Sequence, residues 1–393
     1  MAAMSAAIVQ RRSDRQSRRP TKGASPMRAV LLVSLLTAAC VAHAEETATD
    51  RAFQAALQKI APSIVRLDTV GGAAPVSRFE DEKTGEKITA VTFRPVEGPT
   101  TGVVWSSDGW IVTSSLNFLT QPPVTLATLG DGRRYIAKLI AKDDLTRLAL
   151  LKVDAADLPA PSLAPEPRPG QWALTAGWGF GSRTPALAAG VISAARRNRA
   201  LTIQTDAKTS PANYGGPLFD LDGRLFGICV PQAGSADELA GVEWYDSGIG
   251  FALRCDETAR VVERLKNGVD LVGGVMGISF DPRDTAVAGS QPVGVEAVKV
   301  GSGPAADAGM QAGDFVTAID DEPIRRPLDL DRAMARRRAG DALKITYLRD
   351  GTTLECTVKL VTVAALAMRL EAESASQPAS APADSQPVDS PER

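Results

Sequence analysis

Residues 101–113 of the chain read TGVVWSSDGWIVT. Two runs rich in valine, isoleucine and tryptophan flank the Asp-Gly pair at 108–109, and this arrangement favours a β-hairpin. The same turn signal returns at 131–132 and 222–223, again between short β-prone runs. Many short strands with regular turns predict an all-β barrel or sandwich.

The β-prone runs continue on both sides of this hairpin. We expect further strands at residues 64–67, 124–129, 135–141, 148–153, 190–194, 201–205, 217–219 and 225–230. Helical periodicity is confined to the two ends of the unit, at residues 51–59 and 257–266. These elements predict one β-rich domain over residues 45–267.

A second unit of mixed structure is predicted at residues 268–362. Its most specific stretch is GPAADAGMQAGDFVTAID at residues 303–320, which predicts a short helix, a glycine turn and a strand. Strands are expected at 294–298 and 343–348, with a helix over residues 328–339 between them.

In this order, the motifs of both units resemble those of HtrA/Deg-type, trypsin-like serine proteases with a C-terminal PDZ domain. The matching segments are residues 101–113, 147–152, 203–207, 213–217 and 248–252 in the first unit and 303–320 in the second. The resemblance implies a mainly β fold. A chymotrypsin-like double six-stranded β-barrel would be followed by an α+β PDZ domain.

The catalytic triad of this family would lie at three positions where the chain has other residues. Peptide hydrolysis by such enzymes needs a serine nucleophile, a histidine base and an aspartate. Leu116 stands in place of the histidine, Arg147 in place of the aspartate, and Tyr214 in place of the serine. Leucine accepts no proton, arginine stays cationic, and an unperturbed phenol has a pKa near ~10. Ala212 also replaces the glycine of the turn that presents backbone N–H groups to the oxyanion.

The resemblance and these replacements together predict a pseudoprotease, that is, a protein that is not an enzyme. We expect it to bind polypeptides or partner subunits as a scaffold, an adaptor or a chaperone-like protein in protein quality control. Two alternatives stay open. One is an active serine endopeptidase with a non-standard nucleophile, for which Lys208, Thr209 and Ser210 are the nearest candidates. The other is a structural envelope protein with a vestigial PDZ domain.

A PDZ domain binds an extended peptide as an added strand, between a strand edge and a helix. By resemblance, the expected peptide-binding residues are Val275, Met276, Gly277 and Ile278 of the carboxylate loop, and Leu330 and Met334 of the helix. The implied partners are polypeptide C-termini or extended peptides. The resemblance also implies assembly, either as a homo-oligomer such as a trimer or with an active relative. The arginines at 336–338 are expected to form a solvated face.

The first 44 residues have the pattern of a secretory signal peptide. Basic residues precede a short apolar run at 29–42, and Ala42-His43-Ala44 forms a cleavage site. Translation from Met27 is an alternative, and an uncleaved signal would tether the protein to the membrane. We expect an exported protein, periplasmic or extracellular. His43 is the only histidine, so the mature chain has no histidine base.

Without this segment the chain has 37 basic and 45 acidic side chains, a net charge of −8. That balance argues against a nucleic-acid partner. The missing histidines argue against histidine-based metal sites, and we predict no metal and no cofactor.

Three cysteines follow the signal segment: Cys229, Cys255 and Cys356. If a disulfide forms, we expect it between Cys229 and Cys255, since both lie in the first domain; free buried thiols are the alternative. Residues 363–393 are expected to form a short helix and then a disordered tail rich in serine, proline and alanine.

Overall fold

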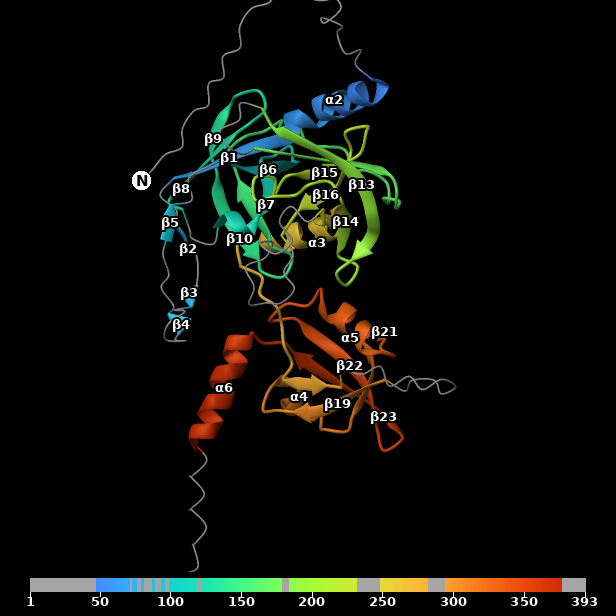
Figure 1. Cartoon of the computed structure of the whole chain (residues 1–393). Coiled ribbons are helices and arrows are strands. Elements are labelled where there is room, and N and C mark those ends of the chain that lie inside the picture. Colours follow the sequence, from blue (N-terminus) through green and yellow to red (C-terminus); the bar gives the residue numbers. More distant parts are fainter. Residues whose placement is uncertain are drawn as a thin grey trace, which may run out of the picture. The chain divides into compact units, whose positions relative to one another are not determined.

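The computed structural model describes residues 47–70, 73–75, 79–80, 87–88, 93–95, 99–118, 122–178, 184–231, 248–281 and 294–376 (Figure 1). The predicted signal peptide and the predicted disordered tail lie outside these ranges. The chain divides into two compact units, Met1–Arg51 and Ala52–Arg393, and both folded domains belong to the second unit. No helix among the described residues is long and apolar enough to cross a membrane.

The first part of the β-rich domain is a seven-stranded sheet with the order β10-β11-β7-β6-β1-β8-β9. Its strands are β1 (Ile64–Val70), β6 (Pro99–Ser106), β7 (Trp110–Ser114), β8 (Val124–Thr128), β9 (Arg134–Ile136), β10 (Lys138–Asp143) and β11 (Leu148–Lys152). Helix α2 (Ala48–Ile60) precedes the sheet, with the short 3₁₀ helix η1 (Ala61–Ser63) between them and a second one, η2 (Ser115–Phe118), after β7. Two small ribbons pair β2 (Ala73–Pro75) with β5 (Phe93–Pro95) and β3 (Phe79–Glu80) with β4 (Lys87–Ile88).

The hairpin predicted from residues 101–113 is present. β6 and β7 pair antiparallel, with Val103 opposite Val112, and both side chains are buried. At the turn, Gly109 takes a φ of 101°, a conformation that glycine adopts without steric cost. The turn therefore sets the register that sends the two valines into the core.

The strand expected at residues 135–141 bends and divides in two. β9 pairs with β8, whereas β10 pairs with β11 at the other end of the sheet. At the bend, the N–H of Ala137 donates to the carbonyl of Thr125 across 2.9 Å. The chain thus joins the two ends of the sheet, which has seven strands where six were expected.

The second part of the domain is a closed barrel with the order β12-β13-β14-β17-β16-β15. Its six strands are β12 (Trp172–Gly177), β13 (Ala186–Arg197), β14 (Thr202–Thr205), β15 (Pro217–Phe219), β16 (Leu225–Cys229) and β17 (Gly250–Arg254). Helix α3 (Cys255–Leu265) follows, and its Val261, Val262 and Leu265 join a core cluster with residues of both sheets. The mainly β, chymotrypsin-like fold class is confirmed.

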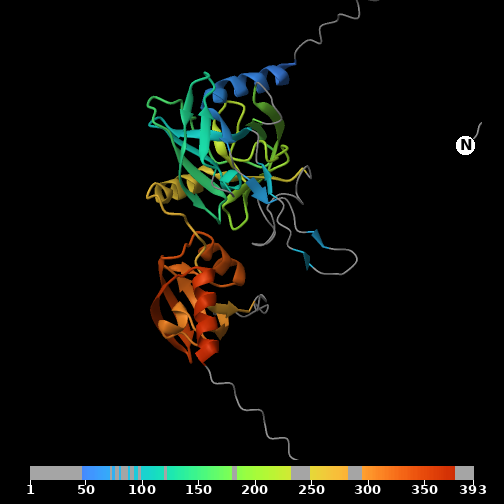
Figure 2. The ribbon, with the colours of Figure 1, turned by 90° about the vertical axis from the view of Figure 1, so that its left-hand side faces the viewer.

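The C-terminal domain has the α+β architecture predicted for a PDZ domain. Its sheet has the order β18-β19-β20-β22-β23, and β21 pairs with β20. The elements are β18 (Ile278–Phe280), β19 (Val295–Val300), α4 (Pro304–Asp307), β20 (Phe315–Ile319), β21 (Glu322–Pro323), α5 (Pro327–Met334), β22 (Ala342–Arg349), β23 (Thr352–Lys359) and α6 (Val363–Ser376). Figure 2 shows α6, in red, running along this domain.

Two expectations for the segment around α5 are wrong. The helix ends at Met334 rather than at residue 339. The arginine stripe at 336–338 is not a solvated face, because Arg338 is 3% exposed and its guanidinium pairs with Asp143 at 2.7 Å. The chain leaves the helix early, and Arg338 bridges to Gly273 instead.

Of the two alternatives left open for Cys229 and Cys255, the structure has the free thiols. Cys229 lies opposite Ala252 in the β16–β17 ladder, and the Sγ of Cys255 donates to the carbonyl of Leu225 at 3.4 Å. Burial raises the pKa of each thiol to about 12. Both are therefore protonated, weakly nucleophilic groups at neutral pH.

This burial predicts slow labelling of the native thiols. At pH 8 a thiol whose pKa rises from its ordinary value of 9.0 to about 12 has on the order of 10³-fold less thiolate, so Cys229 and Cys255 should react with a disulfide reagent at least ~100-fold more slowly than in denaturant. Mass spectrometry after timed labelling measures both rates. Labelling that needs prior reduction in denaturant would contradict the free-thiol assignment.

Candidate active site and peptide-binding groove

The three positions where the resemblance places the triad lie in adjacent segments of the first domain. Leu116 lies in η2, directly after β7, and Arg147 directly precedes β11. The N–H of Ser115 donates to the carbonyl of Arg147 at 2.8 Å, so these two segments are adjacent. A Cβ built on Gly215 would lie 2.6 Å from the N of Ser114, which puts the turn of Tyr214 against the same place.

The side chains at these positions differ in environment. Tyr214 is 5% exposed, whereas Leu116 and Arg147 are half-buried. Arg147 has a φ of 59°, in the left-handed region where long side chains are uncommon. The fold therefore brings the three positions together with a leucine, an arginine and a tyrosine in place of the expected triad.

The turn before Tyr214 is held by its own hydrogen bonds. The N–H groups of Asn213 and Tyr214 donate to the carbonyl of Ser210 at 2.9 and 3.0 Å. The carbonyl of Ala212 accepts from the hydroxyl of Thr101 at 2.7 Å. Because the N–H of Tyr214 has an acceptor inside the turn, this conformation does not present it to a peptide oxyanion.

The C-terminal domain contains the second candidate site, a groove of about 510 Å³ between β18 and α5. All six expected peptide-binding residues line it: Val275, Met276, Gly277, Ile278, Leu330 and Met334. β18 is the edge strand of its sheet, so its outer side is able to accept another strand. The Met276 side chain is also part of the domain core.

The loop at the end of the groove has the features of an anion site. The carbonyls of Met276 and Gly277 accept from Ala305 and Gly301, each at 3.0 Å. The N–H groups of Met276 and Gly277 have no acceptor among the residues that the structure describes. Gly277 has a φ of 82°, which turns the chain at this point. Two adjacent free amides are suited to a carboxylate.

Sequence analysis missed two groove residues, Leu366 and Leu370 of α6. Because they are four residues apart, Leu366 and Leu370 lie on the same face of a helix, and this spacing was the only signal for them in the sequence. No long-range contact of α6 is encoded in that spacing, so the helix was not assigned to the groove.

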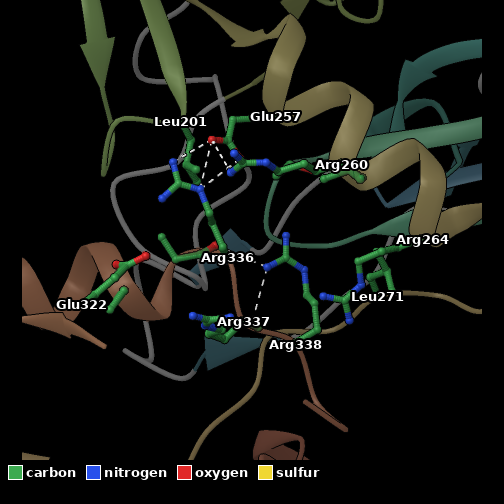
Figure 3. A pocket seen from close by; sticks show the side chains of 13 residues that line it. Leu201, Glu257, Arg260, Arg264, Leu271, Glu322, Arg336, Arg337 and Arg338 are labelled. Carbon is green, nitrogen blue, oxygen red and sulfur yellow. Dashed lines mark hydrogen bonds and ion pairs between the residues drawn. The ribbon is translucent and has the colours of Figure 1, made fainter. Parts of the chain in front are cut away.

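A third cavity, of about 300 Å³, lies next to α3 and is rich in arginine (Figure 3). Its guanidinium groups each have a carboxylate partner. The pairs are Arg260–Glu257, Arg264–Asp341, Arg336–Glu257, Arg337–Asp320 and Arg338–Asp143. This balance of charge indicates a structural ion-pair cluster.

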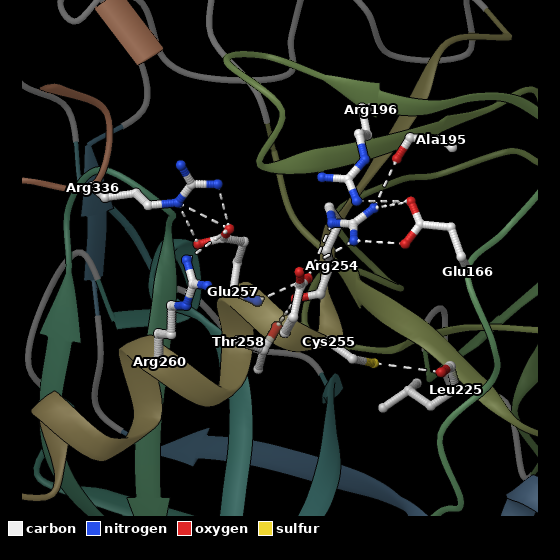
Figure 4. A network of polar contacts seen from close by, with 11 residues as sticks. Glu166, Ala195, Arg196, Leu225, Arg254, Cys255, Glu257, Thr258, Arg260 and Arg336 are labelled. Carbon is white, nitrogen blue, oxygen red and sulfur yellow. Dashed lines mark hydrogen bonds and ion pairs between the residues drawn. The ribbon is translucent and has the colours of Figure 1, made fainter. Parts of the chain in front are cut away.

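Glu257, at the start of α3, pairs with two arginines of this ion-pair cluster, Arg260 and Arg336. A second ion-pair cluster, around Arg254, lies beside it (Figure 4). The Glu257 carboxylate accepts from Arg336 at 2.6 Å, and these hydrogen bonds raise the pKa of Arg336. Next to it, Arg254 makes two hydrogen bonds to Glu166, both at 3.0 Å, which lower the pKa of Glu166. Arg254 also pairs with Asp256 at 3.0 Å. The two clusters hold the first turn of α3 in place.

Two family models match the chain, one for each domain. The model described as a trypsin-like peptidase domain matches residues 100–228, and the one described as a PDZ domain matches residues 274–360.

Curated relatives carry names that agree with these models. A "Probable periplasmic serine endoprotease DegP-like" of Halomonas elongata is 32% identical over 269 residues, which cover 65% of this chain and 55% of the relative. The "Periplasmic pH-dependent serine endoprotease DegQ" of Escherichia coli is 29% identical over 329 residues, covering 78% and 69%. The chain thus spans about half to two thirds of the length of these relatives.

Among solved structures, the "HtrA-type protease AlgW with decapeptide" is 26% identical. The match has a TM-score of 0.58 and covers 79% of this chain and 98% of that one. These names overturn the expectation, drawn from the three replaced triad positions, that the chain is not an enzyme. The relatives that it matches are named as serine endoproteases.

Proposed function

This chain belongs to the HtrA/Deg family of trypsin-like serine proteases with a PDZ domain, and we propose that it is an endopeptidase that selects polypeptides by their C-termini. It is an exported, periplasmic protein, as its relatives are. The observation that carries peptide selection is the groove beside β18, where the amides of Met276 and Gly277, which have no acceptor among the described residues, border an apolar cavity. Assembly as a trimer, or with an active relative, stays a prediction.

The proposal of peptide hydrolysis rests on the names of the relatives. In this chain hydrolysis would have to proceed without the residues of the family's triad. Leu116 supplies no base, so another group has to activate the nucleophile. Ser210, at the start of the turn that contains Tyr214, and Lys208, two residues before it, supply a hydroxyl and an amine. A serine assisted by a lysine is an established variant of this chemistry. In this proposal Ser210 is the nucleophile and Lys208 the base.

A cleavage assay with labelled, unfolded casein tests this assignment. We expect slow turnover by the purified mature chain, and a loss of at least ~100-fold in Ser210→Ala, because removal of a nucleophile has effects of this size or larger. Thr209→Val is the matched control, since it removes a neighbouring hydroxyl at constant shape, and its turnover should stay within about twofold.

Two results would count against the assignment. Turnover that survives in Ser210→Ala would exclude Ser210. If the native chain cleaves no casein while a variant with a rebuilt triad does, the endopeptidase proposal is wrong, and only the proposal of peptide binding remains to be judged.

A further inference from the structure

We infer that helix α6 is part of the peptide-binding site, where it forms a third wall that selects a bulky aliphatic residue at the peptide C-terminus. This inference rests on the proposed peptide binding and adds a specificity element to it. The first observation is that Leu366 and Leu370 line the same groove as Leu330 and Met334 of α5.

The position of α6 follows from the chain path at the carboxylate loop. Val361 bridges to Val275, with reciprocal N–H···O bonds of 2.9 and 3.1 Å. Thr362 then caps the helix, since its hydroxyl accepts from the N–H of Ala365 at 3.1 Å. The helix therefore begins two residues after the segment that holds the loop, and its first turns lie at the carboxylate end of the groove.

Leu366 packs against backbone where two glycines leave room. A Cβ built on Gly303 would lie 2.9 Å from the Cδ1 of Leu366, and one built on Gly277 would lie 3.5 Å from the same atom. The N–H of Gly277, like that of Met276, has no acceptor within the described part of the chain. A carboxylate bound at that loop would thus place the last side chain of the peptide beside Leu366.

An ion pair fixes the next turn of the helix. Arg369 donates to both carboxylate oxygens of Asp307 in α4, at 2.6 and 2.7 Å, and these hydrogen bonds hold the pKa of Asp307 below its ordinary value. Residues 366 and 369 are one turn apart, so α6 is attached at two successive points along its length.

The helix leaves apolar surface unburied toward the groove. Leu370 is 44% exposed although it lines the cavity, and it lies one turn beyond Leu366 on the same face. An extended peptide that ends in leucine would bury Leu370 and fill the space between α6 and α5. Burial of apolar surface makes such a peptide bind more tightly than one with a small polar terminus.

Fluorescence anisotropy with defined peptide pools tests the inference on the full mature chain. The probes are fluorescein-labelled decapeptides, randomised at nine positions, that end in Leu, in Ser, or in Leu as the C-terminal amide. We expect the native chain to prefer the Leu acid over both others. Leu366→Ser and Leu370→Ser should each weaken binding of the Leu pool about tenfold, the effect of one buried leucine side chain, and leave the Ser pool unchanged.

Met368→Ser is the matched control, because Met368 is on the same helix, is 68% exposed and does not line the groove. It should leave all three affinities unchanged. Leu370→Ser keeps the test valid if the more buried Leu366 variant folds poorly, and circular dichroism verifies each fold.

The possible results distinguish a failure of the α6 role from a failure of peptide binding itself. A native chain that binds the Leu acid no better than its amide lacks the carboxylate site, and both ideas are then wrong. If the native chain prefers the acid but Leu370→Ser binds the Leu pool as tightly, only the role of α6 is overturned. Equal loss for the Leu and Ser pools also overturns it, because α6 would then act on the whole domain rather than on specificity.

Discussion

Casein turnover should rise by at least about 10³-fold in a chain that carries Leu116→His, Arg147→Asp, Tyr214→Ser and Ala212→Gly. Loss of triad members costs on the order of 10⁴- to 10⁶-fold in turnover, and part of that range should be recovered when they are supplied. The prediction rests on the adjacency of the segments of Leu116 and Arg147, which are joined by the 2.8 Å hydrogen bond from the N–H of Ser115 to the carbonyl of Arg147.

The local geometry favours these substitutions at two of the four positions. Aspartate tolerates the left-handed region better than arginine, so it suits the φ of 59° at residue 147. Glycine at 212 frees the turn to break the Tyr214–Ser210 hydrogen bond and to direct an N–H toward the substrate. The cost lies at Tyr214, whose buried side chain would leave a cavity worth about 3 kcal/mol of stability.

The comparison needs a control that shares this cost. A chain with the same histidine, aspartate and glycine but with Tyr214→Ala has a similar cavity and no nucleophile at that position, so it should stay at the native level. Fluorogenic casein hydrolysis measures both, after thermal melts show that each is folded. Equal turnover by the two chains would mean that the arrangement of the backbone is not that of an active protease.

The second large effect is expected from Arg338→Ala. Arg338 and Asp143 form a fully buried pair, with side chains 4% and 0% exposed and contacts of 2.7 and 2.8 Å. Removal of one partner leaves an unpaired buried charge, which typically costs about 3–5 kcal/mol. The free energy of unfolding from a urea titration should fall by that amount.

Arg337→Ala is the matched control, because Arg337 is the neighbouring arginine, is 26% exposed and pairs with Asp320 near the surface. Such pairs contribute about 1 kcal/mol or less. The double variant Arg338→Met and Asp143→Leu should recover most of the loss, since apolar residues often replace a buried ion pair without net cost. A loss below 1 kcal/mol in Arg338→Ala would show that water reaches Asp143.

Much of the candidate groove was predictable, because the peptide-binding residues of a PDZ domain lie in short segments that can be recognised in the sequence. The carboxylate loop at 275–278 and the helix residues Leu330 and Met334 all line one cavity, as the resemblance implied. Leu366 and Leu370 were not predictable in the same way. Their place in the groove depends on the bridge from Val361 to Val275 and on the Arg369–Asp307 pair, which join parts of the chain that no local pattern connects.

The hairpins and the succession of β-strands along the chain could be predicted from the amino-acid sequence. Asp-Gly turns and alternating apolar residues act over a few residues, and such short-range preferences can be recognised directly in a sequence. The bend at Ala137, the early end of α5 and the burial of Arg338 could not be predicted in this way. The burial of Arg338 depends on Asp143, which lies 195 residues earlier in the chain. The energy of a buried charge is set by that partner, and the local pattern of three arginines carries no information about it.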